Sequence, residues 1–300
     1  MSERANTAQN THIPQEAFDW YDEYAHGGMD RRTFMRKLGT LAAVGYSMSM
    51  LTTALLPNYA LAEQVSFNDE DITASYETFD SPEGHEQGRG YWVRPATSAT
   101  SYPAVLVIHE NRGLNPYVKD VARRLAKAGF LAFAPDALFP LGGYPGNDDE
   151  GRAMQRTLDK EKIQHDFVAA AKFLKTHSLS NGKLGAVGFC FGGYMVNYLS
   201  AVDSDLLTAG VPFYGTPAPK ELRQNIEAPL MVQLGELDER VNNTWPEYEQ
   251  DLKANKVDYQ MFMYKDAHHG FHNDSTSRFD RASADLAWQR TLAFFTEKLS

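Results

Sequence analysis

The chain has 300 residues, 43% apolar and 23% charged side chains, which fits one globular domain with a large core. Its formal net charge of -10, with no basic stripe over residues 63–300, argues against a nucleic-acid surface and favours a small-molecule partner. A single cysteine, Cys190, excludes an intramolecular disulfide.

The beginning of the chain differs in character from the rest. Residues 1–30 are acidic and aromatic and show neither strand alternation nor a long helical stripe. The pair Arg31-Arg32 then precedes an uncharged stretch over residues 38–62 that ends on Ala-Leu-Ala. This order of basic pair, apolar run and small-x-small exit resembles a twin-arginine export signal with cleavage after Ala62.

Three fates are open for this segment. As an export signal it is a removable leader, residues 1–62, and residues 63–300 form an exported, periplasmic domain without stable membrane insertion. Alternatively, a cytoplasmic protein retains the segment as a helix packed on the domain. The third fate is a membrane anchor, because about 20 apolar residues can span a bilayer.

From Val65 onward the pattern becomes regular. Two runs read as a β-hairpin around the polar loop 81–87, and the continuous apolar run 104–108 is typical of a central strand buried on both faces. The predicted strands are residues 74–79, 90–94, 104–108, 130–134, 183–189, 209–213, 230–234 and 259–263.

Helical patterns separate these strands. Asn115 is a good N-cap, Pro116 suits a first turn and Gly129 ends the apolar repeat, so a helix is predicted between Asn115 and Gly129. Apolar residues at helical spacing predict further helices over residues 163–174 and 284–299.

The alternation of strands and helices predicts an α/β fold, with a mostly parallel central sheet covered by helices on both faces. Ligand sites in such folds lie at the carboxyl ends of the strands. The glycine-punctuated polar loop over residues 142–151 is expected to form part of the rim of that site.

The strongest motif is Gly-Phe-Cys-Phe-Gly-Gly at residues 188–193, between a predicted strand and a predicted helix. A lone cysteine is usually a small buried apolar residue. Here, however, the motif has the G-x-nucleophile-x-G form of a nucleophile elbow, and a helix N-terminus that points at the sulfur favours a thiolate. Cys190 is therefore the predicted nucleophile.

Its partners must follow in the order acid, then histidine, on loops after later strands. Asp238 follows the predicted strand 230–234, and His269 follows the predicted strand 259–263. A histidine oriented by a carboxylate is the usual means of obtaining a thiolate near neutral pH. Glu236 is an alternative acid in the same loop.

The histidines allow a second interpretation. His268, His269 and His272 could form a metal site, but the sequence identifies no matching cysteine or carboxylate ligands. We therefore expect neither a metal nor another cofactor.

Together these motifs resemble the dienelactone hydrolase family, from about residue 70 to the C-terminus. The resemblance implies an α/β-hydrolase fold and a thioester at Cys190. It also implies that Glu110, directly after the first central strand, holds the resting cysteine and helps to ionise it, although a plain loop carboxylate is the alternative. The implied oxyanion hole consists of the backbone N–H groups of Asn111 and Phe191.

The chain departs from the family in its substrate-binding residues. The best-known members bind the substrate carboxylate with two arginines, and this chain has Pro140 and Asn273 at those places. The departure argues against the anionic dienelactone as the natural substrate. Arg112 is a candidate replacement, with a solvated or ion-paired loop arginine as the alternative. Tyr144 and Tyr214 are candidates for the aromatic rim, with ordinary packing as the alternative.

The leading hypothesis is a cysteine hydrolase of small carboxylic esters or lactones. A second hypothesis keeps the fold but not the reaction, as an exported binding or accessory protein with an inert pocket. The third is a metal-dependent hydrolase built on the histidine cluster.

Overall fold

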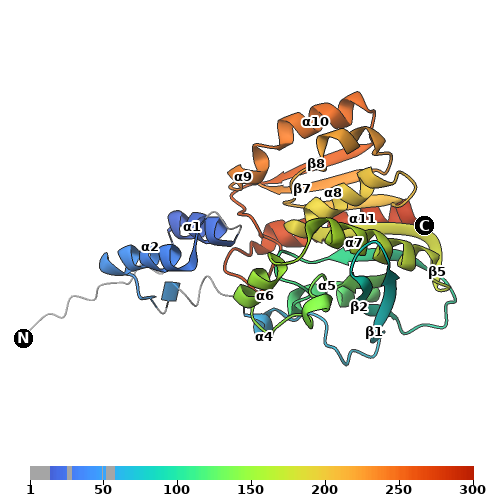
Figure 1. Cartoon of the computed structure of the whole chain (residues 1–300), viewed down its shortest axis with the longest axis horizontal. Coiled ribbons are helices and arrows are strands. Elements are labelled where there is room, and N and C mark those ends of the chain that lie inside the picture. Colours follow the sequence, from blue (N-terminus) through green and yellow to red (C-terminus); the bar gives the residue numbers. More distant parts are fainter. Residues whose placement is uncertain (1–13, 26–28, 49, 52–57) are drawn as a thin grey trace, which may run out of the picture. The chain divides into compact units, whose positions relative to one another are not determined.

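The computed structural model describes residues 14–25, 29–48, 50–51 and 58–300 (Figure 1). The chain packs as two units, Met1–Asn58 with Thr276–Arg278, and Tyr59–Ser275 with Phe279–Ser300. The division falls between Asn58 and Tyr59, and the boundary after Ala62 stays a prediction. Each unit is described by itself.

The first unit contains a pair of helices, α1 (Gln15–Ala25) and α2 (Arg31–Ala43). Their buried side chains form a core of their own, in which the rings of Tyr24 and Phe34 stack 4.9 Å apart. The sequence showed no long helical stripe over residues 1–30, and α1 is a short helix of 11 residues whose Ala17, Phe18, Tyr21 and Tyr24 are buried at helical spacing. This stripe is short and alternates with acidic residues, which conceals it in the sequence.

The arginine pair lies in the first turn of α2, where the Asp30 side chain caps the helix by accepting from the Thr33 backbone N–H at 2.9 Å. Within the described residues, no helix is long and apolar enough to cross a bilayer. Part of the uncharged stretch, residues 49 and 52–57, lies outside the described residues. Export with cleavage after Ala62 therefore stays one of the three interpretations of this segment.

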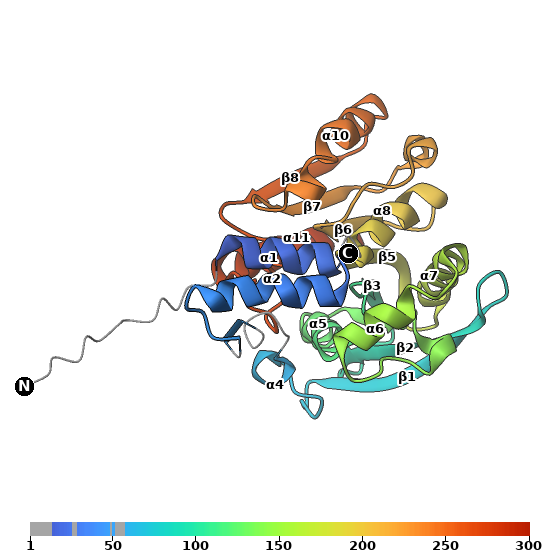
Figure 2. The same ribbon diagram turned by 60° about the vertical axis from the view of Figure 1, so that its left-hand side comes forward.

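The second unit is built on an eight-stranded sheet in the order β1-β2-β4-β3-β5-β6-β7-β8 (Figure 2). The strand β2 runs antiparallel to its two neighbours, and the remaining pairs are parallel. The strands are β1 (Ile72–Ser81), β2 (Glu86–Pro95), β3 (Tyr102–Ile108), β4 (Leu131–Pro135), β5 (Ser180–Phe189), β6 (Ala209–Phe213), β7 (Leu230–Gly235) and β8 (Tyr259–Tyr264). This is the mostly parallel α/β sheet that the sequence predicts, with the hairpin at its edge.

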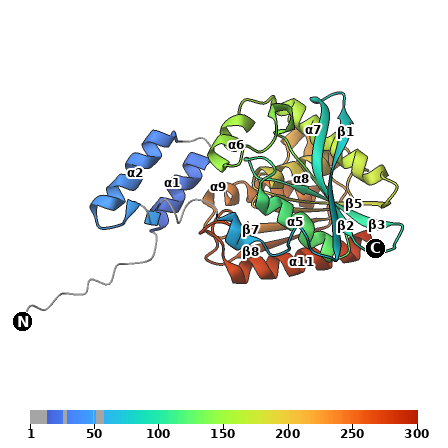
Figure 3. The same ribbon diagram turned by 90° about the horizontal axis from the view of Figure 1, so that it is seen from below.

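Helices cover both faces of this sheet, and Figure 3 shows α7 and α11 on opposite sides of it. Apolar side chains of α5 and α11 pack on one face, and those of α7 and α8 pack on the other. The helices of this unit are α4 (Tyr59–Ala62), α5 (Pro116–Lys127), α6 (Asp148–Gln155), α7 (Lys160–Thr176), α8 (Phe191–Val202), α9 (Glu239–Asn242), α10 (Trp245–Ala254) and α11 (Arg281–Leu299), with short 3-10 turns at η1 (Phe139–Leu141) and η2 (Lys220–Asn225).

Local sequence explains these elements. The run over residues 104–108 is fully buried because β3 lies inside the sheet with helices on both faces. In α5, the side chain of Asn115 accepts from the Val118 N–H at 3.2 Å and Pro116 occupies the first turn, as the sequence predicts. Because β3 to β8 all run parallel to one another, their carboxyl ends share one edge of the sheet.

Replacement of Leu106 by alanine in β3 should lower the free energy of unfolding by about 2–5 kcal/mol, because a fully buried side chain is lost and a cavity remains. Urea unfolding followed by circular dichroism measures this difference. Met263→Ala is the control, since Met263 is 43% exposed on the edge strand β8, and a change of about 0.5 kcal/mol or less is expected there. Equal losses in both variants would contradict the assignment of β3 to the core.

Candidate active site

Cys190 occupies a sharp turn between β5 and α8. Its backbone has φ 56° and ψ -109°, a combination that non-glycine residues rarely adopt and that costs about 1–3 kcal/mol. The Cys190 N–H donates to the carbonyl oxygen of Phe213 at 3.1 Å, which ties the turn to the end of β6. The turn therefore places the cysteine at the carboxyl edge of the sheet, before the first residue of α8.

The glycines of the motif are required by close backbone contacts. A Cβ on Gly188 would lie 2.1 Å from the carbonyl oxygen of Gly192, and a Cβ on Gly192 would lie 2.2 Å from the carbonyl oxygen of Ile108. Only hydrogen atoms fit in these gaps. The contacts bring the N-terminus of α8 onto the end of β3, next to the loop that carries Glu110.

The predicted acid and histidine are in contact. Asp238 follows β7 and caps α9, and its Oδ2 lies 2.5 Å from Nδ1 of His269, which follows β8. Both side chains are buried. If Nδ1 carries the proton donated to Asp238, Nε2 is the nitrogen that can accept one. Glu236, the alternative acid, is exposed and instead accepts from the Asp266 N–H at 2.9 Å.

Arg240 is a neighbour of this pair that the sequence did not single out. Its Nη2 lies 3.4 Å from Nδ1 of His269. The shorter contact to Asp238 sets the orientation of the ring, and the guanidinium places a positive charge beside it. An arginine two residues after the predicted acid has no distinctive signal in a single sequence.

Tyr214 links the histidine to the cysteine turn. It directly follows Phe213, whose carbonyl holds the Cys190 N–H, and its ring centroid lies 4.9 Å from that of His269. The Tyr214 side chain is fully buried. The structure therefore places this predicted rim residue against the imidazole, and its contact with substrate stays a prediction.

Glu110 is a buried carboxylate at the end of β3. Its Oε2 accepts a hydrogen bond of 3.0 Å from Nδ2 of Asn273, four residues beyond His269. Asn273 in turn accepts from the hydroxyl and the N–H of Ser275 through its Oδ1. Asn273 thus fixes the orientation of Glu110 without adding a positive charge.

His109 organises the loop that carries Glu110 and Asn111. Its Nδ1 donates to the Glu110 carbonyl oxygen at 2.5 Å, while its Nε2 accepts from the Ala137 N–H at 3.1 Å. Burial lowers the pKa of His109, which fits this neutral tautomer. The His109 ring also stacks on Phe191, the residue after the cysteine, at 6.0 Å between centroids. The two candidate oxyanion donors therefore lie in segments that this histidine connects.

Arg112 and Tyr144 converge on a carboxylate that was not predicted from the sequence. Arg112 Nη1 lies 2.6 Å from Asp148 Oδ2, and the Tyr144 hydroxyl donates to Asp148 Oδ1 at 2.8 Å. Both members of the ion pair are buried. In the sequence, Asp148 is the first of three consecutive acidic residues, and nothing marks it as buried. The ion-paired alternative for Arg112 is therefore observed, and its role in substrate binding stays a prediction.

Two of the three histidines of the alternative metal site, His269 and His272, make other contacts. His272 is buried, its Nδ1 lies 2.6 Å from the Tyr117 hydroxyl, and burial holds its pKa well below the usual value. His269 contacts Asp238. Among the residues that the structure describes, no three His, Cys, Asp or Glu side chains gather in a way that could hold a metal ion.

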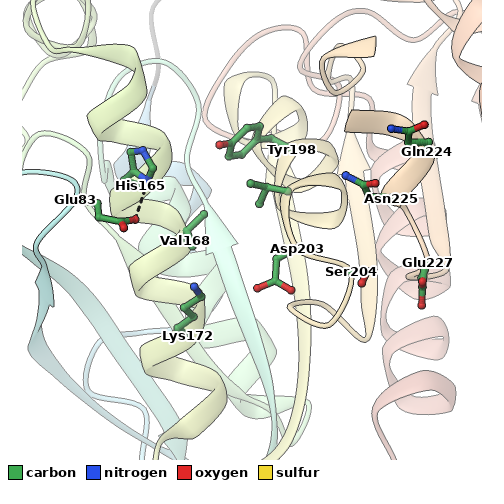
Figure 4. A pocket seen from close by; sticks show the side chains of 11 residues that line it. Glu83, His165, Val168, Lys172, Tyr198, Asp203, Ser204, Gln224, Asn225 and Glu227 are labelled. Atoms are coloured by element: carbon green, nitrogen blue, oxygen red, sulfur yellow. Dashed lines mark ion pairs between the residues drawn. The ribbon is translucent and has the colours of Figure 1, made fainter. Parts of the chain in front are cut away.

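A separate groove of about 560 Å³ lies between α7 and the C-terminal part of α8 (Figure 4). Its lining carries charges of both signs, including Glu83, Lys172 and Asp203, and His165 contacts Glu83 at 3.3 Å. Since Cys190 precedes the opposite end of α8, this groove is remote from the candidate nucleophile.

Comparison with protein families gives two matches. A model of the dienelactone hydrolase family matches residues 89–299, and a model described as YqhI-like matches residues 5–43. The first match covers more than half of the chain and includes the candidate nucleophile, acid and histidine. The second covers the arginine pair and α2.

Individual relatives also match more than two thirds of this chain. Protein usf of Aquifex pyrophilus is 36% identical over 71% of this chain and 94% of its own length. A protein of Aquifex aeolicus provisionally named carboxymethylenebutenolidase is 34% identical over 69% of this chain and 92% of its own. A crystal structure from Klebsiella pneumoniae, provisionally titled dienelactone hydrolase, is 25% identical, with a TM-score of 0.64 over 75% of this chain and 99% of its own.

Replacement of Gly192 by alanine should lower both stability and any activity that depends on Cys190, because the new methyl group would force the backbone of α8 away from Ile108. We expect a loss of several kcal/mol in urea unfolding. Gly39→Ala in α2 is the control, since a Cβ there meets nothing within 4 Å and alanine favours a helix by about 0.5–1 kcal/mol. A Gly192→Ala protein as stable and reactive as wild type would refute the tight contact.

Proposed function

This chain is a member of the dienelactone hydrolase family and a hydrolase of carboxylic esters or lactones, and we propose that it works through a Cys190 thiolate, His269 and Asp238. The observation that carries the proposal is the 2.5 Å contact between His269 and Asp238, in a unit whose cysteine occupies a strained strand-to-helix turn. A free thiol ionises near about pH 8.5, so the nucleophile needs this help at neutral pH.

In the first half-reaction, the Cys190 thiol gives its proton to Nε2 of His269, directly or after transfer through Glu110, and the sulfur attacks the carbonyl carbon to form a tetrahedral oxyanion. The backbone N–H groups of Phe191 and Asn111 are the proposed donors to that oxygen. The oxyanion then collapses, the carbon–oxygen bond to the leaving group breaks, and the alcohol or enol leaves with a proton from His269. The acyl group stays on Cys190 as a thioester.

In the second half-reaction, water attacks the thioester carbonyl and gives its proton to Nε2 of His269. Asp238 stabilises the imidazolium through Nδ1. Breakdown of this second intermediate breaks the carbon–sulfur bond and releases the acid, and the proton on His269 returns to the Cys190 sulfur. Esters and lactones suit this route better than amides, because an amine leaves less readily than a thiolate.

Glu110 is proposed to act on the resting cysteine. It is a buried carboxylate held by Asn273 and lies on the loop that meets the N-terminus of α8. A carboxylate beside the thiol can accept its proton before substrate binds. In this chain Asn273 orients Glu110 without neutralising it, which keeps the carboxylate available as a base.

Replacement of Cys190 by serine should abolish hydrolysis of p-nitrophenyl acetate, with a loss of at least about 1,000-fold, because the alcohol is a far weaker nucleophile than the thiolate. Intact mass spectrometry should show an acetyl adduct on wild type and none on the variant. Circular dichroism serves as the folding control. Full activity in the variant would reject the cysteine mechanism, and a wild type without activity or adduct would favour the inert binding protein.

Replacement of Glu110 by glutamine should slow alkylation of Cys190 by iodoacetamide about 10-fold near neutral pH, because the amide keeps the shape and the hydrogen bond but cannot take the proton. Since Cys190 is the only cysteine, the mass increase reports on this residue alone. Glu249→Gln, at a half-buried pair with Tyr259 remote from the site, is the matched control. An unchanged rate in Glu110→Gln would contradict the proposed role.

A further inference from the structure

The segment over residues 59–65, here called the strap, lies against α5 (Figure 2). The buried carboxylate of Asp120 accepts from the Val65 N–H at 2.9 Å, and Arg123 donates to the Val65 carbonyl at 2.6 Å. Glu63 adds an ion pair to Arg123 at 3.1 Å. Arg124 donates to the Ala62 carbonyl at 3.5 Å, so the strap is held on both sides of the bond between Ala62 and Glu63.

The first residue of the strap reaches the carboxylate that holds Arg112. The Tyr59 hydroxyl donates to Asp148 Oδ1 at 2.6 Å and accepts from Nδ2 of Asn115 at 2.9 Å. Burial raises the pKa of Tyr59, and the Asp148 charge raises it further, so the phenol stays protonated and can donate. Burial alone would raise the pKa of Asp148, but Arg112 and the two phenols outweigh it and lower that pKa.

This carboxylate fixes the loop over residues 110–115, which carries the candidate oxyanion donor Asn111. Arg112 is bound to Asp148 at 2.6 Å, and the Gly113 N–H donates to the Gln155 side chain at 3.2 Å. A Cβ on Gly151 would lie 2.3 Å from the Arg112 carbonyl oxygen, so α6 packs directly on the loop backbone. A shift of Asp148 would therefore move the backbone next to Asn111.

The other end of the strap supports the opposite side of the same site. Gln64 Nε2 donates to Asp274 Oδ2 at 2.7 Å, and Arg124 holds the same carboxylate. Asp274 directly follows Asn273, which binds Glu110. Glu110 is therefore supported through Asn273, independently of the contact that Tyr59 makes.

We propose that Tyr59 is a positioning residue for hydrolysis, which holds the backbone N–H of Asn111 in the oxyanion hole through Asp148 and Arg112. This role rests on the proposed function. Tyr59 does not touch the reacting atoms, and its effect is confined to the step in which an oxyanion forms. Ionisation of Cys190 depends instead on His269 and Glu110, so Tyr59 should not alter it.

The test compares two reactions of the same cysteine in full-length wild type and Tyr59→Phe. Ester hydrolysis passes through an oxyanion, whereas alkylation by iodoacetamide occurs at a saturated carbon and forms none. We expect kcat/KM for p-nitrophenyl acetate to fall about 10- to 100-fold, since a misplacement of about 1 Å can cost about 100-fold. The rate of iodoacetamide alkylation should stay within about twofold of wild type.

The matched control is Tyr259→Phe, at the amino end of β8. It also removes a hydroxyl that donates to a carboxylate, since the Tyr259 hydroxyl donates to Glu249 at 2.9 Å. Both rates should equal those of wild type in this variant. Melting temperatures show that the variants are folded. Wild-type ester kinetics in Tyr59→Phe would overturn the positioning role and leave the proposed function intact, as would an equal loss in both reactions, which indicates general damage to the site.

Failure of the proposed function has a different signature. Wild type would then be alkylated by iodoacetamide but would hydrolyse no ester, and the role of Tyr59 would fall with it.

Processing offers a second test, because cleavage after Ala62 removes Tyr59. The intact mass of the enzyme purified from its own cells should correspond to a chain that still contains Tyr59. A fully active mature chain that begins at Glu63 would overturn the proposal.

Discussion

The strained turn at Cys190 is the constraint on which the rest of the site depends. A left-handed backbone angle at a non-glycine residue persists only where the surroundings fix it. Here the Phe213 carbonyl holds the Cys190 N–H, and Gly188 and Gly192 allow backbone contacts that a methyl group would prevent. The strands β3, β5 and β6 must therefore lie side by side before the cysteine can take its place.

The same turn determines what surrounds the sulfur. Contact between Gly192 and Ile108 brings the N-terminus of α8 to the loop that begins with His109, so both candidate oxyanion donors come from adjacent backbone. Contact of Tyr214 with His269 brings the loops after β6 and β8 together. Three loops far apart in the sequence thus meet at one edge, as is expected for parallel strands.

Buried charges near this edge are paired or hydrogen-bonded. Asp148 balances Arg112 and accepts from two phenols, while Glu110 accepts from Asn273. An uncompensated buried charge costs several kcal/mol, and these contacts offset the cost of burying the two carboxylates. The partner of Glu110 is the amide of Asn273, and the loop arginine, Arg112, is ion-paired with Asp148.

The sequence by itself determined the order of strands and helices, the nucleophile motif and the chain order of Cys190, Asp238 and His269, because periodicity, caps and glycine spacing are local. Only the tertiary structure decided that Arg112 binds Asp148, that Asn273 holds Glu110 and that Tyr59 joins the site. These pairs are separated by 36, 163 and 89 residues, and no local pattern reports which polar side chains become buried together. Helix α1 escaped prediction for a related reason, since its short stripe is recognisable only against the helix that covers it.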